Sequence, residues 1–301
     1  MTLPITILGG YLGSGKTTMV NHLLRHADGL RLAVLVNEFG ALPIDRDLIV
    51  AEDEDIISIA GGCVCCSYGN DLTLALLDLA KLDPAPDHVL LESSGVALPG
   101  AIAASVSLLG DYALDGVVVL ADAETIRAQA RDTYVGDTIE RQLCDADLVV
   151  LNKTDLIADT DRTETEAWVK TVNPDAEIIG ASFGQVPPTI LLQSFLSRDR
   201  GDDARDTHRI DAFRTVALAI DHAVDADRLA KGLSSAELGL VRAKGFVRTP
   251  DGSMMTIQVV GRRSTVSPML DTASTGLVAI GNPATFNETS LNALIASASS
   301  I

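Results

Sequence analysis

The sequence predicts an α/β domain with a mainly parallel sheet, followed by a smaller α+β domain. Strand-like apolar runs alternate with helical periodicity from residue 3 to residue 172, which is typical of a parallel sheet covered on both faces. A stretch dense in charge and without an apolar anchor interrupts the chain at 197–206. Beyond it, strand-like runs follow one another with two helical segments, which favours an α+β arrangement.

The first strand is expected at residues 3–8, running into Gly9 and Gly10, and a helix should follow from Thr17 to about His26. Further strands are predicted at 32–36, 56–59, 89–91, 117–120 and 148–151. Helical periodicity predicts helices at 72–82, 101–109, 124–131 and 163–172. Ligands of such sheets bind at the carboxyl ends of the strands, so the residues that follow these strands are the candidates for a site.

The second domain is expected to begin after a charged linker. We assign residues 1–196 to the first domain, 197–211 to the linker and 212–301 to the second domain. Strands are predicted at 215–220, 241–247, 254–260 and 276–280, and helices at 226–233 and 288–298. Thr285 and Glu288 have the spacing of a capping box at the start of the last helix.

Composition excludes several classes of protein. The formal net charge is −18, which argues against nucleic acid as a partner, because phosphate backbones require clustered Lys and Arg. The first ten residues lack the basic start of a signal peptide. The apolar stretch 89–110 is interrupted by Glu92 and Pro99, so we expect no membrane span. We expect a cytoplasmic protein with reduced thiols.

A phosphate-binding loop is predicted at Gly10–Thr17, GYLGSGKT, between the first strand and the first helix. Its glycines let backbone N–H groups point at phosphate oxygens, and the helix N-terminus adds partial positive charge. Lys16 should reach the β- and γ-phosphates, and the Thr17 hydroxyl should bind Mg²⁺. The predicted phosphate-binding residues are Gly10, Gly13, Ser14, Gly15, Lys16, Thr17 and Thr18.

A second motif predicts which base is bound. Asn152-Lys153-Thr154-Asp155 follows the strand at 148–151, at the same edge of the sheet as the phosphate-binding loop. The carboxylate of Asp155 can accept two hydrogen bonds from the ring N–H and the amino group of guanine. Such bonds contribute about 1.5 to 3 kcal/mol each, so the motif predicts GTP rather than ATP.

Two further segments fit a hydrolytic site. Glu92 ends a predicted strand, where a magnesium contact is expected in phosphoryl transfer, and the Gly95 N–H can bond the γ-phosphate. We therefore predict Lys16 and Glu92 as catalytic residues. The segment 37–40, Asn-Glu-Phe-Gly, is a candidate switch that orders around Mg²⁺ and the γ-phosphate.

Three of the four cysteines lie within four residues, in Cys63-Val64-Cys65-Cys66. Zinc and related metals prefer thiolates, and a short loop can turn several sulfurs toward one point. Cys144 is expected to be an ordinary core residue. His22 and His26, four residues apart on the first helix, are expected to form a partly exposed helix face rather than a metal pair.

Together these motifs resemble the CobW-like metallochaperone GTPases, a branch of the P-loop GTPases. The resemblance depends on five segments in order, and Arg242 to Phe246 is similar to the opening of the family's C-terminal domain. It implies a P-loop GTPase domain and a CobW-type C-terminal α+β domain. The five segments are Gly10–Thr17, 37–40, 61–66, 92–95 and 152–155.

The resemblance implies GTP hydrolysis to GDP and phosphate, coupled to delivery of zinc or cobalt to a client metalloprotein. It makes Cys63, Cys65 and Cys66 the metal ligands, and a fourth ligand could come from Glu38, water or the client. It makes Asn152, Lys153 and Asp155 the guanine-binding residues. Dimers are common in this class of GTPase, so a homodimer is a further expectation.

Other functions fit the same motifs. The chain could be a GTP-binding sensor of zinc or redox state, or an activator dedicated to one metalloenzyme. The cysteines could also form a structural zinc module, in which case chelators should unfold the protein. Thiolates bind zinc, cobalt, nickel and iron, so the motif alone does not select the metal.

Overall fold

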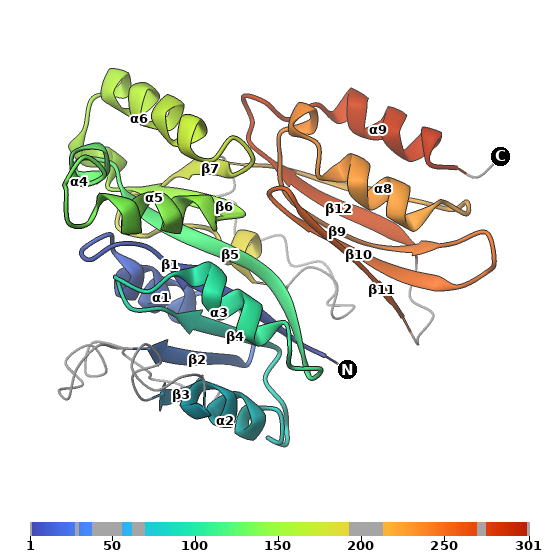
Figure 1. The fold of residues 1–301 in the computed structure, drawn as a ribbon. Coiled ribbons are helices and arrows are strands. Elements are labelled where there is room, and N and C mark those ends of the chain that lie inside the picture. The colour runs from blue at the N-terminus through green and yellow to red at the C-terminus, as the bar shows by residue number, and fades with distance from the viewer. Residues whose placement is uncertain are drawn as a thin grey trace. The chain divides into compact units, whose positions relative to one another are not determined.

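The computed structural model describes residues 2–27, 30–37, 56–61, 70–192, 213–269 and 275–299. The chain divides into two compact units, Met1–Gln193 and Ser194–Ile301, with one sheet in each (Figure 1). The predicted linker, 197–211, lies outside the described residues. None of the helices in the described ranges has both the length and the apolar composition needed to cross a membrane.

The first unit contains a seven-stranded sheet in the order β3-β2-β4-β1-β5-β6-β7, and all of its strand pairs are parallel. The parallel α/β fold predicted from the sequence is confirmed. The strands are β1 (Leu3–Gly9), β2 (Leu32–Asn37), β3 (Ile56–Gly61), β4 (His88–Glu92), β5 (Tyr112–Asp122), β6 (Leu148–Asn152) and β7 (Glu177–Gly180).

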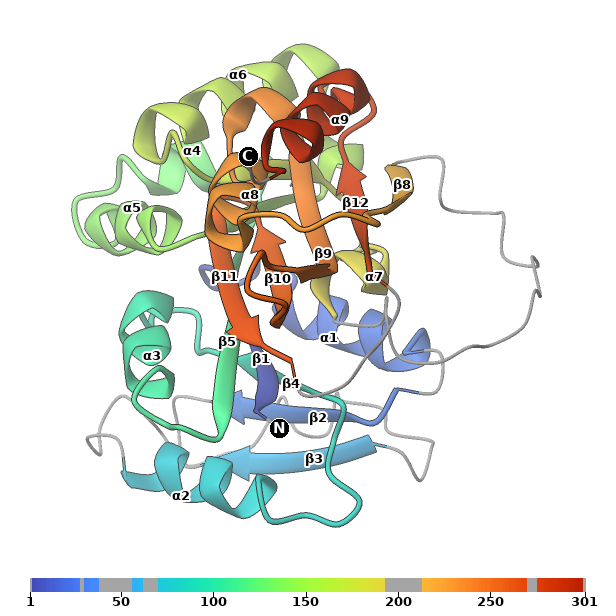
Figure 2. The ribbon, with the colours of Figure 1, turned by 90° about the vertical axis from the view of Figure 1, so that its right-hand side faces the viewer.

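Helices cover both faces of this sheet, which explains why its central strands are mostly apolar. In Figure 2, α3 and α5 lie on one side of the strands, and α1 and α7 lie on the other. The helices of this unit are α1 (Lys16–Arg25), α2 (Asn70–Leu79), α3 (Pro99–Val106), α4 (Ile126–Gln129), α5 (Gly136–Cys144), α6 (Asp159–Val172) and α7 (Pro188–Leu191).

The register brings the carboxyl ends of the strands together at one edge. Leu8 of β1 pairs with Glu92 of β4, Asn37 of β2 pairs with Gly61 of β3, and Asp122 of β5 pairs with Asn152 of β6. Residues far apart in the sequence therefore leave the sheet as neighbours. We call this edge, with the segments that follow it, the carboxyl edge.

The interior of the sheet also holds a buried polar network around Thr6. The Thr6 hydroxyl lies 2.9 Å from Nε2 of His88, 3.4 Å from Oδ2 of Asp115 and 3.1 Å from the carbonyl oxygen of Leu191. The side chains of Thr6, His88 and Asp115 are all at most 4% exposed. The network links three strands to the end of α7, immediately before the described part of this unit ends.

Several elements differ from those predicted. The strand predicted at 117–120 extends over Tyr112–Asp122, because Asp115 is buried in the Thr6 network instead of forming a turn. The helix predicted at 124–131 shortens to α4, and α5, α7 and β7 were not predicted. The 4-residue α7 and β7 are too short to give a periodic pattern.

The second unit has a five-stranded antiparallel sheet in the order β11-β10-β9-β12-β8, with α8 and α9 packed on one face (Figure 1). This is the predicted α+β class. Its elements are β8 (Arg214–Ala219), α8 (Ala226–Leu233), β9 (Leu240–Arg248), β10 (Met254–Val260), β11 (Arg263–Pro268), β12 (Gly276–Gly281) and α9 (Glu288–Ser297).

One expected helix cap in this unit is wrong. Thr285 does not cap the last helix, because α9 begins at Glu288 and the side chain of Asn287 accepts a hydrogen bond from Ser290 N at 3.0 Å. An Asn carboxamide supplies the same kind of acceptor for the first free N–H groups as the predicted Thr hydroxyl.

The strand β11 was also not predicted.

Candidate functional site

The loop between β1 and α1 has the backbone that phosphate binding requires. Gly10, Gly13 and Gly15 have φ values of +130°, +76° and +100°. Two of these glycines also lie close to other segments: a Cβ at Gly10 would lie 2.3 Å from Leu120 O, and a Cβ at Gly15 would lie 2.4 Å from Nδ2 of Asn152. Larger residues would therefore clash as well as strain the turn. Of the remaining loop residues, Ser14 is buried and Thr18 is exposed on the first turn of α1.

Lys16 is the first residue of α1, and its ammonium group is held inside the turn of this loop. Nζ donates to the carbonyl oxygens of Gly10 at 2.8 Å and Tyr11 at 3.3 Å. The residue is only 8% exposed. A buried positive charge is thus fixed where the loop glycines and the helix N-terminus also favour an anion.

Thr17 and Glu92 are brought into contact at the carboxyl edge. The Thr17 hydroxyl donates to Oε1 of Glu92 at 3.1 Å, although the two residues are 75 positions apart in the sequence. Glu92 is the last residue of β4 and is 5% exposed. Two oxygen donors of the kind that Mg²⁺ prefers therefore lie side by side next to the phosphate-binding loop.

Three buried hydroxyl groups close to these residues have no hydrogen-bond partner among the described atoms. They belong to Ser14 in the loop and to Ser93 and Ser94, which follow Glu92 directly. Buried polar groups in folded proteins are nearly always hydrogen-bonded, and exceptions frequently mark a place where a ligand, ion or water belongs. This part of the carboxyl edge therefore has the character of a binding site.

Asn152 connects the phosphate-binding loop to a segment that the sequence did not single out. Its Nδ2 donates to Ser14 O at 2.8 Å, and its Oδ1 accepts from Gly184 N at 2.9 Å. The side chain is buried at 2% exposed. Asn152 therefore fixes the loop after β7 beside α1. The sequence analysis did not predict this loop as part of the site, because β7, with 4 residues, is too short to give a recognisable strand pattern.

The next two motif residues have different surroundings. Lys153 has φ of +63°, and its Nζ forms an ion pair with Oδ2 of Asp122 at 2.6 Å. Asp122 ends β5 and was not predicted as a site residue, because its contact depends on the pairing of β5 with β6. Asp155 is exposed in a 3₁₀ turn, Thr154–Leu156, so its carboxylate is accessible to a ligand.

Gly95 lies against the phosphate-binding loop. A Cβ at this position would lie 2.5 Å from Cδ2 of Leu12 and 2.9 Å from Leu12 N. From the other side, Nε2 of Gln142 on α5 donates to the carbonyl oxygens of Gly95 and Ala97 at 3.1 and 2.8 Å. Gln142 was also missed, because nothing in its local sequence indicates a contact with the segment after β4.

The predicted metal ligands Cys63, Cys65, Cys66 and Glu38 lie outside the described residues, as does the rest of the candidate switch beyond Asn37. The register does show where the two segments that carry these residues leave the sheet, because Asn37 and Gly61 pair at the ends of β2 and β3. Among the described residues, no group of three His, Cys, Asp or Glu side chains could hold a metal ion.

Cys144 and the two helix histidines are described. The expected core position of Cys144 is wrong, because this last residue of α5 is exposed while the neighbouring Leu143 is buried. His22 and His26 stack with ring centroids 4.4 Å apart. Nε2 of His22 lies 3.2 Å from Val186 O, and Nδ1 of His26 lies 2.8 Å from His22 O. Each of these two nitrogens is therefore hydrogen-bonded to a backbone carbonyl oxygen.

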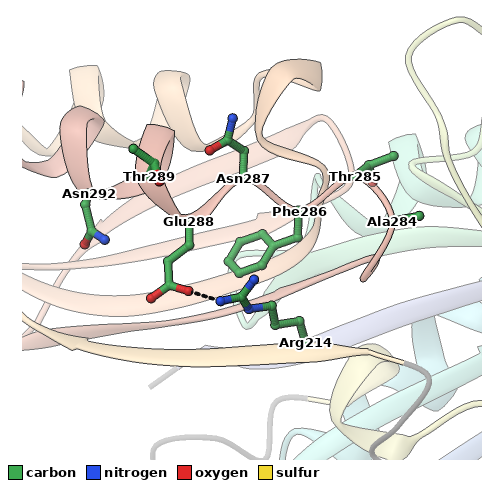
Figure 3. Close-up of a pocket in the computed structure, with 8 residues that line it drawn as sticks. All are labelled: Arg214, Ala284, Thr285, Phe286, Asn287, Glu288, Thr289 and Asn292. Carbon is green, nitrogen blue, oxygen red and sulfur yellow. Dashed lines mark hydrogen bonds and ion pairs between the residues drawn. The ribbon is translucent and has the colours of Figure 1, made fainter.

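The second unit contains an open polar cavity of about 460 Å³ at the start of α9. Figure 3 shows Arg214 beside Glu288 and Phe286; the guanidinium carbon lies 5.7 Å from the Phe286 ring centroid and the two charges form an ion pair. The ion pair neutralises the cation that an anionic ligand would need. The features expected of a nucleotide site therefore lie in the first unit.

Comparison with known proteins assigns both units to families. Residues 4–180 match the CobW/HypB/UreG nucleotide-binding domain, and residues 213–299 match the cobalamin synthesis protein CobW C-terminal domain. The first match runs from β1 to the end of β7 in the first sheet. The second covers the antiparallel sheet with its two helices.

Relatives support this assignment over most of the chain. The chain is 31% identical to the zinc chaperone CobW of Sinorhizobium sp, over 87% of this chain and 86% of that protein. It is 31% identical to the zinc-regulated GTPase metalloprotein activator 1 of Dictyostelium discoideum, over 64% of this chain and 49% of that protein. The crystal structure of the zinc-bound YjiA GTPase from E. coli matches over 100% of both chains, with a TM-score of 0.51 and 23% identity, and so shows the same fold. The chain thus belongs to the CobW/HypB/UreG family of P-loop GTPases and carries the CobW C-terminal domain, as the sequence motifs predict.

Proposed function

We propose that this protein hydrolyses GTP and couples that hydrolysis to the binding and delivery of a divalent metal, with zinc as the first candidate and cobalt as the second. The observation that carries the proposal is the arrangement of strand ends. The segments after β1 and β4 form the phosphate site, and those after β2 and β3 lead into Glu38 and the cysteine motif. Phosphate and metal would therefore bind at one edge of one sheet.

Guanine recognition is assigned to the motif after β6. Asp155 is exposed and can accept two hydrogen bonds from guanine, which adenine does not offer in the same arrangement. Asn152 holds the phosphate-binding loop in place, and the ion pair with Asp122 holds Lys153 beside the same site. The base and the phosphates would thus be bound by residues that are already connected to one another.

Hydrolysis is assigned to the residues around Lys16. The Lys16 ammonium group and the loop N–H groups would stabilise charge on the phosphates as water attacks the γ-phosphorus and GDP leaves. Thr17 and Glu92 would hold Mg²⁺, and their contact at 3.1 Å supports that role. When bound, Mg²⁺ supplies positive charge that neutralises the β- and γ-phosphate oxygens.

The metal cargo is assigned to the thiolates of Cys63, Cys65 and Cys66, with a fourth position supplied by Glu38, water or the client. Because binding requires deprotonated thiols, metal affinity should rise with pH below the usual cysteine pKa. Reduced thiols are also required, so we propose that the protein works in a reducing compartment such as the cytoplasm. The names of the Sinorhizobium and Dictyostelium relatives favour zinc.

The test separates the two activities by mutation. Replacing all three cysteines with serine should remove stoichiometric zinc binding while GTP hydrolysis at saturating Mg²⁺ continues. Lys16→Ala should abolish GTP hydrolysis while stoichiometric zinc binding continues. The control is Cys144→Ser, which changes an exposed cysteine away from the site and should alter neither activity. A triple variant that still binds one zinc per chain would contradict the assignment of the metal site.

Delivery is distinguished from sensing by following the metal. A zinc-loaded chaperone should transfer zinc to an apo-metalloprotein faster with GTP than with a non-hydrolysable analogue, whereas a sensor should retain it. A dedicated activator would act on a single client. The Dictyostelium relative carries the name of an activator, so this second candidate is tested by comparing several apo-proteins. Sedimentation in each nucleotide state would test the expected homodimer.

A further inference from the structure

Gln142, in the last turn of α5, makes an unusual contact for a residue of a surface helix. Its side chain is 1% exposed, and its single amide nitrogen donates to two carbonyl oxygens of another segment. Those oxygens belong to Gly95 and Ala97, which are 47 and 45 positions away in the sequence. α5 is therefore hydrogen-bonded directly to the segment that follows Glu92.

The residue type fits this contact closely. A neutral carboxamide carries two N–H donors on one nitrogen and can satisfy two buried carbonyl groups without bringing in a charge. A carboxylate of the same shape would present oxygens to oxygens, and an apolar side chain would leave both carbonyls without a donor. Either change would cost the Gly95 segment its attachment to α5.

The segment is also fixed at its other side and at its far end. Gly95 packs against Leu12 so closely that a Cβ would lie 2.5 Å from the Leu12 side chain. Gly100 N donates to Oδ2 of Asp145, which caps α5, at 2.8 Å. A backbone held between the phosphate-binding loop and α5 has little freedom to move only while both supports are intact.

We infer that Gln142 is a positioning residue for γ-phosphate recognition, which holds the Gly95 backbone in the geometry that distinguishes GTP from GDP. The inference rests on the proposed function and on the expectation from the sequence that the Gly95 N–H bonds the γ-phosphate. GDP lacks that phosphate, so loosening the Gly95 segment should weaken GTP binding and leave GDP binding nearly unchanged. The nucleotide preference is then set partly by a residue that touches no nucleotide.

The experiment compares Gln142→Met with a matched control, Asn173→Leu. Asn173 is also a buried amide, and its Nδ2 donates to Leu143 O and Ala146 O at 2.7 and 3.0 Å, at the end of the same helix but away from Gly95. Affinities for GTPγS and GDP, kcat and KM for GTP, and thermal unfolding are measured on the full chain. Both variants should lower the melting temperature.

Only Gln142→Met should lower the ratio of GTPγS to GDP affinity, by about tenfold, the effect of weakening one hydrogen bond to a charged group. Its kcat should fall with that ratio. If Gln142→Met does not fold, Gln142→Asn, which keeps the amide but is one methylene shorter, should shift the ratio in the same direction. An unchanged ratio in a folded Gln142 variant, or an equal loss in Asn173→Leu, would overturn the inference. Wild-type protein that binds neither nucleotide would instead overturn the proposed function, and the inference would fall with it.

Discussion

The carboxyl edge of the first sheet and the interior of the same sheet hold buried polar groups of two kinds. In the interior, Thr6 contacts His88, Asp115 and Leu191, and the Tyr112 hydroxyl donates to Leu76 O at 2.6 Å. Burial, with a smaller effect of Asp111, raises the pKa of Tyr112 to about 12, so this donor keeps its proton. These groups satisfy one another within the protein.

At the carboxyl edge, several buried polar groups have no such partners among the described residues. The Ser14, Ser93 and Ser94 hydroxyls are buried without a described partner, and the Lys16 ammonium group donates to the carbonyl oxygens of Gly10 and Tyr11 in the phosphate-binding loop. Buried polar groups that form hydrogen bonds with one another stabilise the fold. Buried polar groups without a hydrogen-bond partner in the protein are available to a ligand. The difference separates structural polar residues from candidate functional ones, and substitutions of Lys16, Thr6 and Ser93 test it.

The largest effect is expected at Lys16. Lys16→Ala should lower kcat for GTP by about 10³-fold, because it removes a fixed positive charge that faces the developing charge on the phosphates. The free energy of unfolding should fall by only about 1 kcal/mol, the loss expected when the loop carbonyl oxygens lose the ammonium donor. Single-turnover hydrolysis and chemical denaturation of the same variant check both halves. A variant that hydrolyses GTP at the wild-type rate would remove Lys16 from the site.

The second largest effect is expected on the preference for guanine, from substitution of Asp155. Asp155→Asn should lower the preference for GTP over other purine nucleotides by about 10²-fold, because an amide cannot accept both hydrogen bonds that guanine donates. Competition binding with GDP, IDP and XDP measures the preference. XDP, which carries a carbonyl in place of the amino group, should gain affinity relative to GDP. Unaltered selectivity would mean that another residue reads the base.

The interior network provides the opposite case. Thr6→Val keeps the shape of the side chain but removes the hydroxyl, and should lower the free energy of unfolding by about 2 kcal/mol, because buried partners lose a hydrogen bond. Urea denaturation measures the loss. Nucleotide affinity of the folded fraction should not change. If Thr6→Val altered nucleotide binding without altering stability, the distinction between the two regions would be wrong.

The smallest effect is expected at Ser93, the matched control for Thr6 at the carboxyl edge. Ser93→Ala removes a hydroxyl that is 1% exposed but has no described hydrogen-bond partner, so unfolding should change by less than about 0.5 kcal/mol without ligand. A loss as large as that of Thr6→Val would show that the hydroxyl is satisfied in the folded protein.

The sequence predicted the phosphate-binding loop, because eight consecutive residues carry both its conformation and its chemistry. It also predicted the parallel fold, since apolar runs and helical periodicity are local patterns. It did not predict that Asp122 pairs with Lys153 or that Asn152 reaches Gly184. Those contacts depend on the order of β5, β6 and β7 in the sheet, and β7 is too short to be recognised. Gln142 was missed for a related reason, because its partners lie after a strand that precedes it by 50 residues along the chain.

Zinc affinity in two nucleotide states tests the central claim, that phosphate and metal share one edge of the sheet, most directly. The measurement is a competition titration of the wild-type protein with a zinc chelator in the presence of Mg²⁺ and either GTPγS or GDP. Linkage requires that GTPγS tighten zinc binding by the same factor by which zinc tightens GTPγS binding, and the account predicts that this factor exceeds one. Equal zinc affinity with GTPγS and GDP would contradict it.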